Sequence, residues 1–285
     1  MSITGDFSRQ SFLGPHSHEI LAGIRVVIAG LGGGGSHIAQ QLAHVGVGEI
    51  RLLDPDCIEA SNLNRLVGAT QEDVDQGRPK VGIAERVINS VRPWITVAAR
   101  QKKWQEAAEL IQDAHVVFGC LDGFQQRDYL EGAARRYCLP YIDVGMDVTQ
   151  ISENSYAVAG QMIMTHPCGP CLRCLGFITP ERLAREENRY GDAGINPQVV
   201  WTNGTLASLA VGAFMKLVTP WFSTREQYTW LELDGNAQTV TPSLQPDYMP
   251  KFDVCPHRGG RDGLGDPFFS ISGLTGYGTR SSMTA

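Results

Sequence analysis

Glycines crowd residues 30–35, directly after an apolar run. Glycine lets the backbone approach a phosphate closely, and a helix start offers N–H groups without partners. Asp54 ends the next apolar run, about 20 residues further on, where a carboxylate can hydrogen-bond ribose hydroxyls. These residues indicate a nucleotide site that would suit NAD or ATP, and the glycines expected to contact the nucleotide are Gly30, Gly32, Gly33 and Gly35.

Two candidate cations follow the carboxylate, Arg65 in Asn-Leu-Asn-Arg and Lys80 in Gly-Arg-Pro-Lys. A dinucleotide has little use for them. A carboxylate that attacks the α-phosphate of ATP builds negative charge, which fixed Arg and Lys side chains can stabilise. Asp122 follows another apolar run, where it could hold Mg²⁺ between phosphates. Each residue alone could be a surface ion pair or a helix cap, but together they favour ATP and Mg²⁺.

The chain has seven cysteines, an odd count, and three of them lie close together at Cys168, Cys171 and Cys174. This pattern suits a metal site better than a disulfide framework, and it fits a reducing compartment. Cys171 and Cys174 have the spacing of one half of a zinc site.

The elements that must position these residues alternate between short apolar runs and amphipathic stretches, which predicts an α/β protein whose first half is a parallel sheet flanked by helices. The later strands predict an antiparallel addition. The predicted strands cover residues 25–30, 49–54, 95–100, 115–120, 140–145, 156–164, 228–233 and 238–241, and the predicted helices cover 36–45, 80–91, 104–113, 123–138 and 207–217.

Composition narrows the class of protein. The chain has 285 residues, of which 42% are hydrophobic and 19% charged, as in an ordinary compact protein. The net charge of -6 argues against general binding to nucleic acid or to an anionic membrane surface. No apolar run is long enough to span a membrane, and residues 1–6 do not resemble a secretory signal, so we expect a cytoplasmic protein.

Five segments together resemble the ThiF/MoeB/ubiquitin-activating-enzyme superfamily over about residues 7–241: GLGGGGSHIAQQLAHVGVGEIRLLDPD, SNLNRLVGA, GRPKV, CLDGFQQRDYL and PCLRCL. The resemblance implies a Rossmann-like mixed sheet. It also implies that the chain activates the C-terminal carboxylate of a ubiquitin-like or sulfur-carrier protein with a glycine-ended tail, as an acyl-adenylate, with release of pyrophosphate. It assigns ribose to Asp54, phosphates to Arg65 and Lys80, magnesium to Asp122, and a further polar contact to Asn62.

The resemblance also implies a division of the chain into three parts. Residues 1–24 would form an arm whose Arg9 reaches the ATP of the neighbouring subunit, which predicts a homodimer. Residues 25–243 would form the adenylation domain. Residues 244–285 would form a zinc-linked segment and a tail whose many glycines and few apolar residues predict flexibility.

The zinc half-site differs from that of the relatives, which carry a second Cys-x-x-Cys near the C-terminus. This chain has Cys255-Pro-His257 instead. We expect Cys171, Cys174 and Cys255 to bind a structural zinc, with either His257 or Cys168 as the fourth ligand.

A second departure concerns covalent chemistry, because many relatives have a cysteine nucleophile where this chain has Tyr190. A thiolate attacks an acyl-adenylate more readily than a hydroxyl does. Three outcomes follow in order of preference: direct transfer to a partner, an ester on Thr202, Thr205 or Ser208, or a thioester on a displaced cysteine.

The interpretation that we favour from the sequence is an ATP- and Mg²⁺-dependent activating enzyme of a bacterial ubiquitin-like conjugation pathway, with a conjugating enzyme as a further partner. The compact length favours the bacterial origin. An activator of sulfur carriers for thiamine or molybdopterin synthesis shares nearly every motif. Further alternatives are a peptide-modifying adenylating enzyme, an NAD-dependent oxidoreductase and a non-catalytic scaffold.

Overall fold

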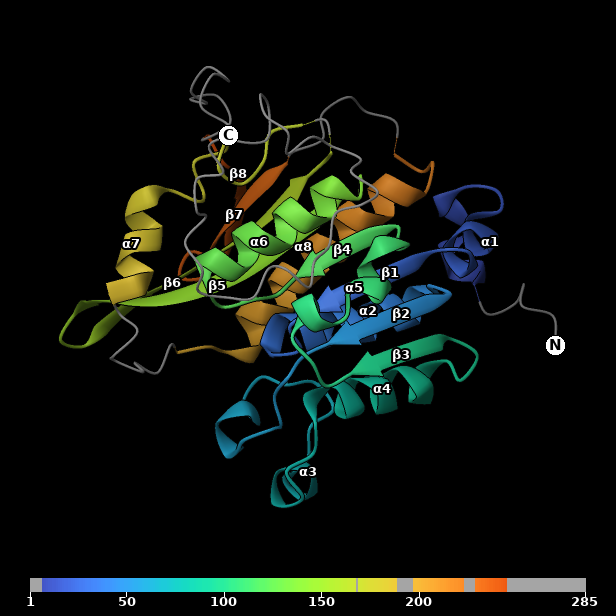
Figure 1. The fold of residues 1–285 in the computed structure, drawn as a ribbon, viewed down its shortest axis with the longest axis horizontal. Helices are drawn as coiled ribbons and strands as arrows, with labels where there is room; N and C mark the ends of the chain where they lie inside the picture. Colours follow the sequence, from blue (N-terminus) through green and yellow to red (C-terminus); the bar gives the residue numbers. More distant parts are fainter. Residues whose placement is uncertain (1–6, 168, 189–196, 223–228, 245–285) are drawn as a thin grey trace, which may run out of the picture.

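A computed structural model describes residues 7–167, 169–188, 197–222 and 229–244. Eight strands form one sheet in the order β3-β2-β1-β4-β5-β6-β7-β8 (Figure 1). The strands are β1 Arg25–Ala29, β2 Glu49–Leu53, β3 Thr96–Arg100, β4 Val116–Gly119, β5 Tyr141–Ser152, β6 Ser155–Thr165, β7 Trp230–Asp234 and β8 Thr239–Pro242. The helices are α1 Ser17–Ala22, α2 Gly33–Val45, α3 Gln71–Asp75, α4 Lys80–Val91, α5 Ala108–Gln112, α6 Phe124–Arg136, α7 Pro180–Asn188 and α8 Val200–Val218.

Strand direction changes halfway across the sheet. The strands β3, β2, β1, β4 and β5 are parallel, whereas β5 to β8 pair antiparallel. This confirms the predicted Rossmann-like mixed sheet. The chain moves outward from β1 through β2 to β3 and then returns to the other side of β1 with β4. Ligands of open α/β sheets bind where the strand order reverses in this way, at the carboxyl ends of the strands.

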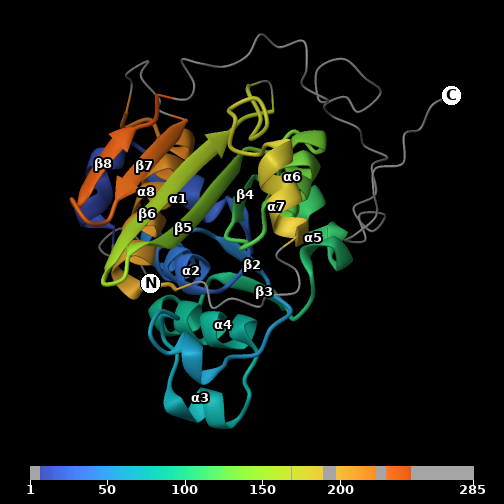
Figure 2. The ribbon, with the colours of Figure 1, turned by 90° about the vertical axis from the view of Figure 1, so that its left-hand side faces the viewer.

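Helices cover both faces of the sheet, and Figure 2 shows α1, α2 and α8 on one side and α5, α6 and α7 on the other. Side chains alternate between these layers, as expected for strands buried on both faces. Val26 and Ile28 join the core formed with α2, α4 and α8. Val27 and Ala29 join the core formed with α5 and α6.

Two helices next to the carboxyl ends of the parallel strands differ from their predictions. The helix predicted to start at residue 36 begins at Gly33, and its first turn includes Gly33 and Gly35, where an added Cβ would clash with neighbouring atoms. The single helix predicted for residues 104–113 is divided into a 3₁₀-helix, Trp104–Glu106, and α5. Ala107, with φ -135° and ψ 47°, leaves the helical conformation between them.

The helix predicted for residues 207–217 is longer than expected and spans Val200–Val218. Its first half contacts α2, and Ser208 accepts a hydrogen bond from Gln41 at 3.1 Å. In the part of the chain that the structure describes, no helix is long and apolar enough to cross a membrane.

The N-terminal segment, from residue 7, contains a 3₁₀-helix, Ser8–Leu13, and α1. Leu13 and Leu21 are buried in the same core as α2 and α8, so this segment packs onto the body of the fold. The Gly48 N–H donates to the Leu21 carbonyl at 3.0 Å, which places α1 at the edge where the parallel strands begin (Figure 1).

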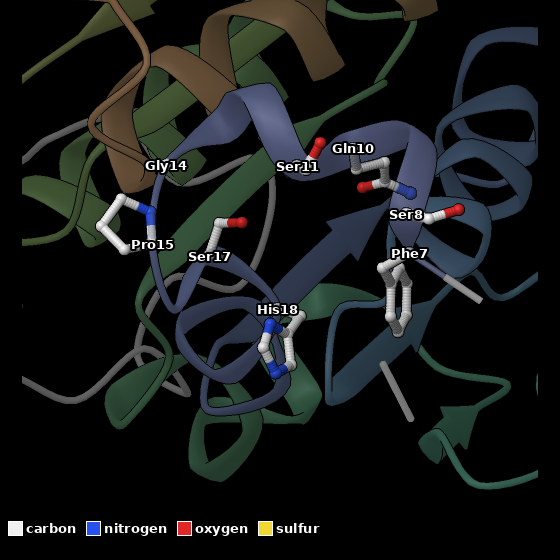
Figure 3. A pocket seen from close by; sticks show the side chains of 8 residues that line it. All are labelled: Phe7, Ser8, Gln10, Ser11, Gly14, Pro15, Ser17 and His18. Atoms are coloured by element: carbon white, nitrogen blue, oxygen red, sulfur yellow. The ribbon is translucent and has the colours of Figure 1, made fainter. Parts of the chain in front are cut away.

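A small hollow of about 240 Å³ lies within this segment (Figure 3). Serine hydroxyls, the Gln10 amide and the His18 imidazole provide its polar side chains. It has no Lys, Arg or carboxylate among its described lining residues, so it lacks the groups that a triphosphate and its metal ion require.

Candidate functional site

A cavity of about 530 Å³ opens at the carboxyl ends of β1, β2 and β4, where the strand order reverses. Its size is within the range of small-molecule sites. Residues far apart in the sequence meet in its wall. The residues predicted for the site that line it are Gly30, Gly32, Asp54, Asn62, Arg65, Lys80 and Asp122.

The glycines of residues 30–35 serve two different purposes. Gly30 has φ 90°, and a Cβ there would lie 2.3 Å from the Cys120 carbonyl oxygen. A Cβ on Gly35 would lie 1.9 Å from the Gly30 carbonyl oxygen. At Gly32 nothing among the described atoms lies within 4 Å of an added Cβ, so here the backbone is open to the cavity.

Gly33 and Gly35 were predicted to contact the nucleotide, but they do not line the cavity. Both are buried, and a Cβ on Gly33 would lie 2.3 Å from the Asn203 side chain of α8. Their role in the structure is to let α2 start close to β1 and α8. The first hydrogen bond of α2 runs from the Ser36 N–H to the Gly32 carbonyl. The N–H groups of residues 33–35 come before this bond, at the start of the helix.

Asp54 holds the glycine loop in place. Its Oδ2 accepts from the Leu31 N–H at 2.6 Å, and its Oδ1 accepts from the Asp56 N–H at 2.8 Å. Burial raises the pKa of the Asp54 carboxyl, and these two N–H groups and Lys80 oppose that shift. Each oxygen has remaining lone pairs, which could accept from a ribose hydroxyl.

Lys80 lies at the start of α4 with its ammonium group turned toward Asp56. The distance from Lys80 Nζ to Asp56 Oδ2 is 2.8 Å, and the Lys80 N–H also donates to the Asp56 carbonyl at 3.0 Å. The Lys80 side chain is 13% exposed and the Asp56 side chain 62%. An arriving phosphate can therefore compete with a largely hydrated carboxylate for this ammonium.

The loop that carries Arg65 is ordered by a short 3₁₀-helix, Ala60–Asn62. Asn62 is buried, and its Oδ1 accepts from the Glu59 N–H at 3.1 Å. Arg65 is half-buried and donates to the Ser61 carbonyl at 2.6 Å. A guanidinium and an amide from this loop therefore line the same cavity as Gly30 and Gly32.

Asp122 follows β4 and is exposed in the cavity. Gln198, just before α8, contacts its Oδ1 at 3.4 Å. No three His, Cys, Asp or Glu side chains among the described residues are grouped so that they could hold a metal ion. A single carboxylate still fits Mg²⁺, because this ion usually takes one or two carboxylates and completes its shell with phosphate oxygens and water.

Sequence reasoning missed several residues of the cavity wall, among them Lys103, Trp104, Gln105 and Gln126. They come from the segment after β3 and from the first turn of α6. The sequence predicted one continuous helix over residues 104–113. Such a helix gave no reason to place Trp104 and Gln105 at the carboxyl edge of the sheet. The only available signal was their place after a predicted strand.

A buried ion pair beneath Asp122 was also missed. Arg127 Nη1 lies 3.1 Å from Asp143 Oδ2, and the Tyr141 hydroxyl donates to Asp143 Oδ1 at 2.8 Å. Arg127 Nε donates to the Leu121 carbonyl at 2.6 Å, which ties this network to the loop carrying Asp122. Burial raises the pKa of Asp143, and the Arg127 guanidinium opposes the shift.

A second network supports the turn that carries Lys80. Asp73 is buried, and it accepts from Arg86 at 2.6 and 2.7 Å and from the Thr70 N–H at 2.9 Å. Arg78 lies 3.1 Å away and is two residues before Lys80. These partners hold the pKa of the Asp73 carboxyl well below its usual range, chiefly through Arg86.

Replacing Asp73 by Asn should lower the free energy of unfolding by about 2 kcal/mol at neutral pH, because hydrogen bonds to charged groups are lost. It should also weaken ATP binding severalfold, because the turn before Lys80 loses its anchor. Since the folded pKa is depressed, the stabilisation is present above the ordinary pKa of 3.8 and is lost as the pH falls below it. Urea unfolding and calorimetric titration with ATP check both effects, with exposed Asp75→Asn on the same helix as control. Equal behaviour of the two variants would contradict the prediction.

The candidate zinc residues are only partly described. Cys171 and Cys174 have their sulfur atoms 3.5 Å apart, and the Cys174 N–H contacts Cys171 Sγ at 3.4 Å. This separation is too long for a disulfide bond and leaves two thiols on one turn. The other candidate ligands, Cys168, Cys255 and His257, lie outside the described residues.

Two further predicted positions remain, Arg9 and Tyr190. Arg9 is exposed in the N-terminal 3₁₀-helix and does not line the cavity of its own chain. The predicted contact in trans therefore stays a prediction. Tyr190, at the place of the relatives' cysteine, lies outside the described residues.

Comparison with known proteins finds relatives of this chain by sequence and solved structures with the same fold. The chain is 32% identical over 201 residues to the sulfur carrier protein ThiS adenylyltransferase of Escherichia coli. The matched segment covers 69% of this chain and 74% of that relative. It is 32% identical over 195 residues to the molybdopterin-synthase adenylyltransferase of E. coli, covering 67% and 72%. The match to the ThiS adenylyltransferase of Bacillus subtilis, at 32% over 178 residues, spans 61% of this chain but only 51% of that relative.

Solved structures share the fold at lower identity. E. coli MccB with ATP superposes with a TM-score of 0.70 and 20% identity, covering 88% of this chain and 73% of MccB. The microcin C7 biosynthetic enzyme MccB in complex with N-formylated MccA gives a TM-score of 0.72, also at 20% identity, covering 88% and 74%. The ThiF family pattern matches residues 7–252, which include both the sheet and every lining residue of the cavity. By this match, and in agreement with the resemblance seen in its motifs, the chain belongs to the ThiF family.

Proposed function

We propose that this chain uses ATP to adenylate the C-terminal carboxylate of a small carrier protein. The observation that carries the proposal is the meeting of Arg65 and Lys80 with the open backbone at Gly32 in one cavity. Two cations beside a helix start suit a triphosphate. An NAD-dependent oxidoreductase would leave both cations without a purpose.

The proposed reaction is a displacement at the α-phosphorus of ATP. A carboxylate oxygen of the carrier forms a bond to phosphorus, the bond from phosphorus to the bridging oxygen of the β-phosphate breaks, and pyrophosphate leaves. No general base is needed, because the carboxylate is already ionised near neutral pH. The work of the protein is to hold the reactants in line and to stabilise the negative charge with Lys80 and Arg65. Mg²⁺, held through Asp122, would add charge neutralisation between the phosphates.

A sulfur-carrier protein is the substrate class that the relatives favour, because the similar proteins from E. coli are named as adenylyltransferases of ThiS and of molybdopterin synthase. A ubiquitin-like conjugation pathway, which we favoured from the sequence, has weaker support from these names. The structural resemblance to MccB supports the fold alone at 20% identity. We therefore propose a sulfur-carrier protein as the first candidate substrate.

The test is carrier-dependent exchange of radiolabelled pyrophosphate into ATP. A purified sulfur-carrier protein with a glycine-ended tail should support exchange, and the same protein with its C-terminal carboxylate amidated should not, because the nucleophile is missing. Exchange that does not depend on the free carboxylate would contradict the proposal. Intact mass measurement of the enzyme in the same reaction separates direct transfer from an ester or thioester on the enzyme.

We propose further that two enzyme chains pair so that Arg9 of each chain reaches the nucleotide of the other. Its exposure and its absence from the cavity of its own chain are compatible with such an exchange. Sedimentation analysis should give a dimer. A stable monomer with full exchange activity would contradict this arrangement.

A structural zinc on Cys171 and Cys174 is proposed for the same chain. The two neighbouring sulfur atoms on one turn support it, and thiolates are preferred zinc ligands. Elemental analysis of the purified full chain should find about one zinc per chain, and Cys174→Ser should lower that content and the thermal stability. Cys57 is the control, since it is exposed and lies away from this turn in the sequence. Unchanged zinc content in Cys174→Ser would contradict the assignment.

A further inference from the structure

One wall of the cavity carries a buried amide oxygen that has no hydrogen-bond partner among the described residues. Gln105 is 6% exposed and lines the cavity, and its Oε1 accepts no hydrogen bond from the described residues. Burying an amide oxygen without a donor costs free energy, so such atoms are rare and need an explanation. In a cavity wall, the missing donor can be supplied by a ligand.

The neighbouring hydrogen bonds establish which atom of Gln105 is the oxygen. The indole nitrogen of Trp104 can only donate, and it contacts Gln126 Oε1 at 3.3 Å. Gln126 therefore presents an acceptor at this point. The atom of Gln105 that contacts the same oxygen at 2.6 Å must be the donor Nε2. The unpartnered atom is thus an acceptor, and Gln126 holds it in its orientation.

The position of Gln105 separates it from the groups suited to phosphates. Trp104, the residue next to it, packs in the core shared with α5 and α6. The start of α2 and Lys80 of α4 belong to the layer on the opposite face of the sheet, where Val81 is part of the other core. Asp54 directly follows β2, which lies between β1 with its glycine loop and β3 with the segment that carries Gln105. A nucleotide with its phosphates at the glycine loop and its ribose at Asp54 would place its base on the β3 side of the ribose, where Gln105 lines the cavity.

We propose that Gln105 selects the base of the nucleotide by accepting a hydrogen bond from the 6-amino group of adenine at its Oε1. The proposal rests on the proposed use of ATP and adds the residue that would distinguish ATP from other triphosphates. Guanine carries a carbonyl oxygen at position 6, so two acceptors would face each other and the buried amide would stay unpaired. Sites with a buried polar group reject analogues that cannot pair with it.

The test compares two nucleotides that differ only in the group concerned. Calorimetric titration of the full chain with Mg-ATP and with the Mg complex of purine riboside 5′-triphosphate, which lacks the 6-amino group, measures its contribution to binding. The unaltered chain should bind ATP about tenfold more tightly. In Gln105→Leu the two affinities should become equal, mainly through weaker binding of ATP. The control Gln112→Leu, at an exposed position at the end of α5, should keep the tenfold difference.

The outcomes distinguish this proposal from the proposed function. Equal affinities of the unaltered chain for the two nucleotides would overturn the role of Gln105 and leave ATP use intact. So would a Gln105→Leu variant that still prefers ATP tenfold. Failure of the unaltered chain to bind either nucleotide would overturn both. The comparison of nucleotides on the unaltered chain needs no variant to fold, and thermal unfolding checks Gln105→Leu itself.

Discussion

Replacing Lys80 by Ala should lower kcat/KM for carrier-dependent pyrophosphate exchange by about 10²- to 10³-fold, the usual effect of removing one group that stabilises developing charge. Lys80 lines the cavity with its ammonium 2.8 Å from Asp56, where a phosphate could replace the carboxylate as its partner. The Asp56 side chain is 62% exposed, so the loss of this ion pair should change stability little. Arg65→Ala should have an effect of similar size, since its guanidinium lines the same cavity.

The control for this prediction is Lys102→Ala. Lys102 is exposed, carries the same charge and does not line the cavity. Thermal unfolding of all three variants should match the unaltered chain within a few degrees. Exchange at the unaltered rate in Lys80→Ala would contradict the role of Lys80 in stabilising the developing charge, while carrier-dependent exchange itself would still report adenylation.

The sequence predicted those parts of the site that follow regular strands. Gly30, Asp54 and Asp122 each come at the end of a buried strand, and parallel strands bring their carboxyl ends to one edge. Arg65 and Lys80 were predicted as phosphate ligands from their local motifs. The sequence did not give the distance between the two side chains. The alternation of apolar segments was sufficient for the mixed sheet, because both layers of helices leave a regular pattern in the strands.

The parts that sequence reasoning missed depend on contacts between distant segments. Gln105 and Gln126 meet because the segment after β3 turns toward α6, and a local pattern of a helix gives no sign of that turn. Gly33 was assigned to the nucleotide by its motif, whereas its tight packing against Asn203 of α8 appears only in three dimensions. Arg127 and Asp143 were not singled out, since pairing between α6 and β5 cannot be read from either segment alone.

The buried pair beneath the Asp122 loop carries the largest expected effect on stability. Arg127→Met should lower the free energy of unfolding by about 3–5 kcal/mol at neutral pH, because it leaves the fully buried Asp143 carboxylate without its counter-charge. It also removes the donor to the Leu121 carbonyl, so Mg-ATP should bind more weakly. Urea unfolding and calorimetry measure the two effects. Arg100→Met, at an exposed position on β3, is the matched control.

The pH dependence of this variant tests the cause of the instability. Burial raises the pKa of Asp143, and in Arg127→Met the guanidinium that opposes the shift is gone. A raised folded pKa gives a stability contribution that is present below the unfolded value of 3.8 and is lost as the pH rises through the folded pKa. The deficit of the variant should therefore be larger at pH 8 than at pH 5. Adding Asp143→Asn keeps an acceptor for the Tyr141 hydroxyl but removes the charge, so the double variant should recover part of the lost stability. A double variant as unstable as Arg127→Met alone would mean that lost packing, rather than the unpaired carboxylate, causes the deficit.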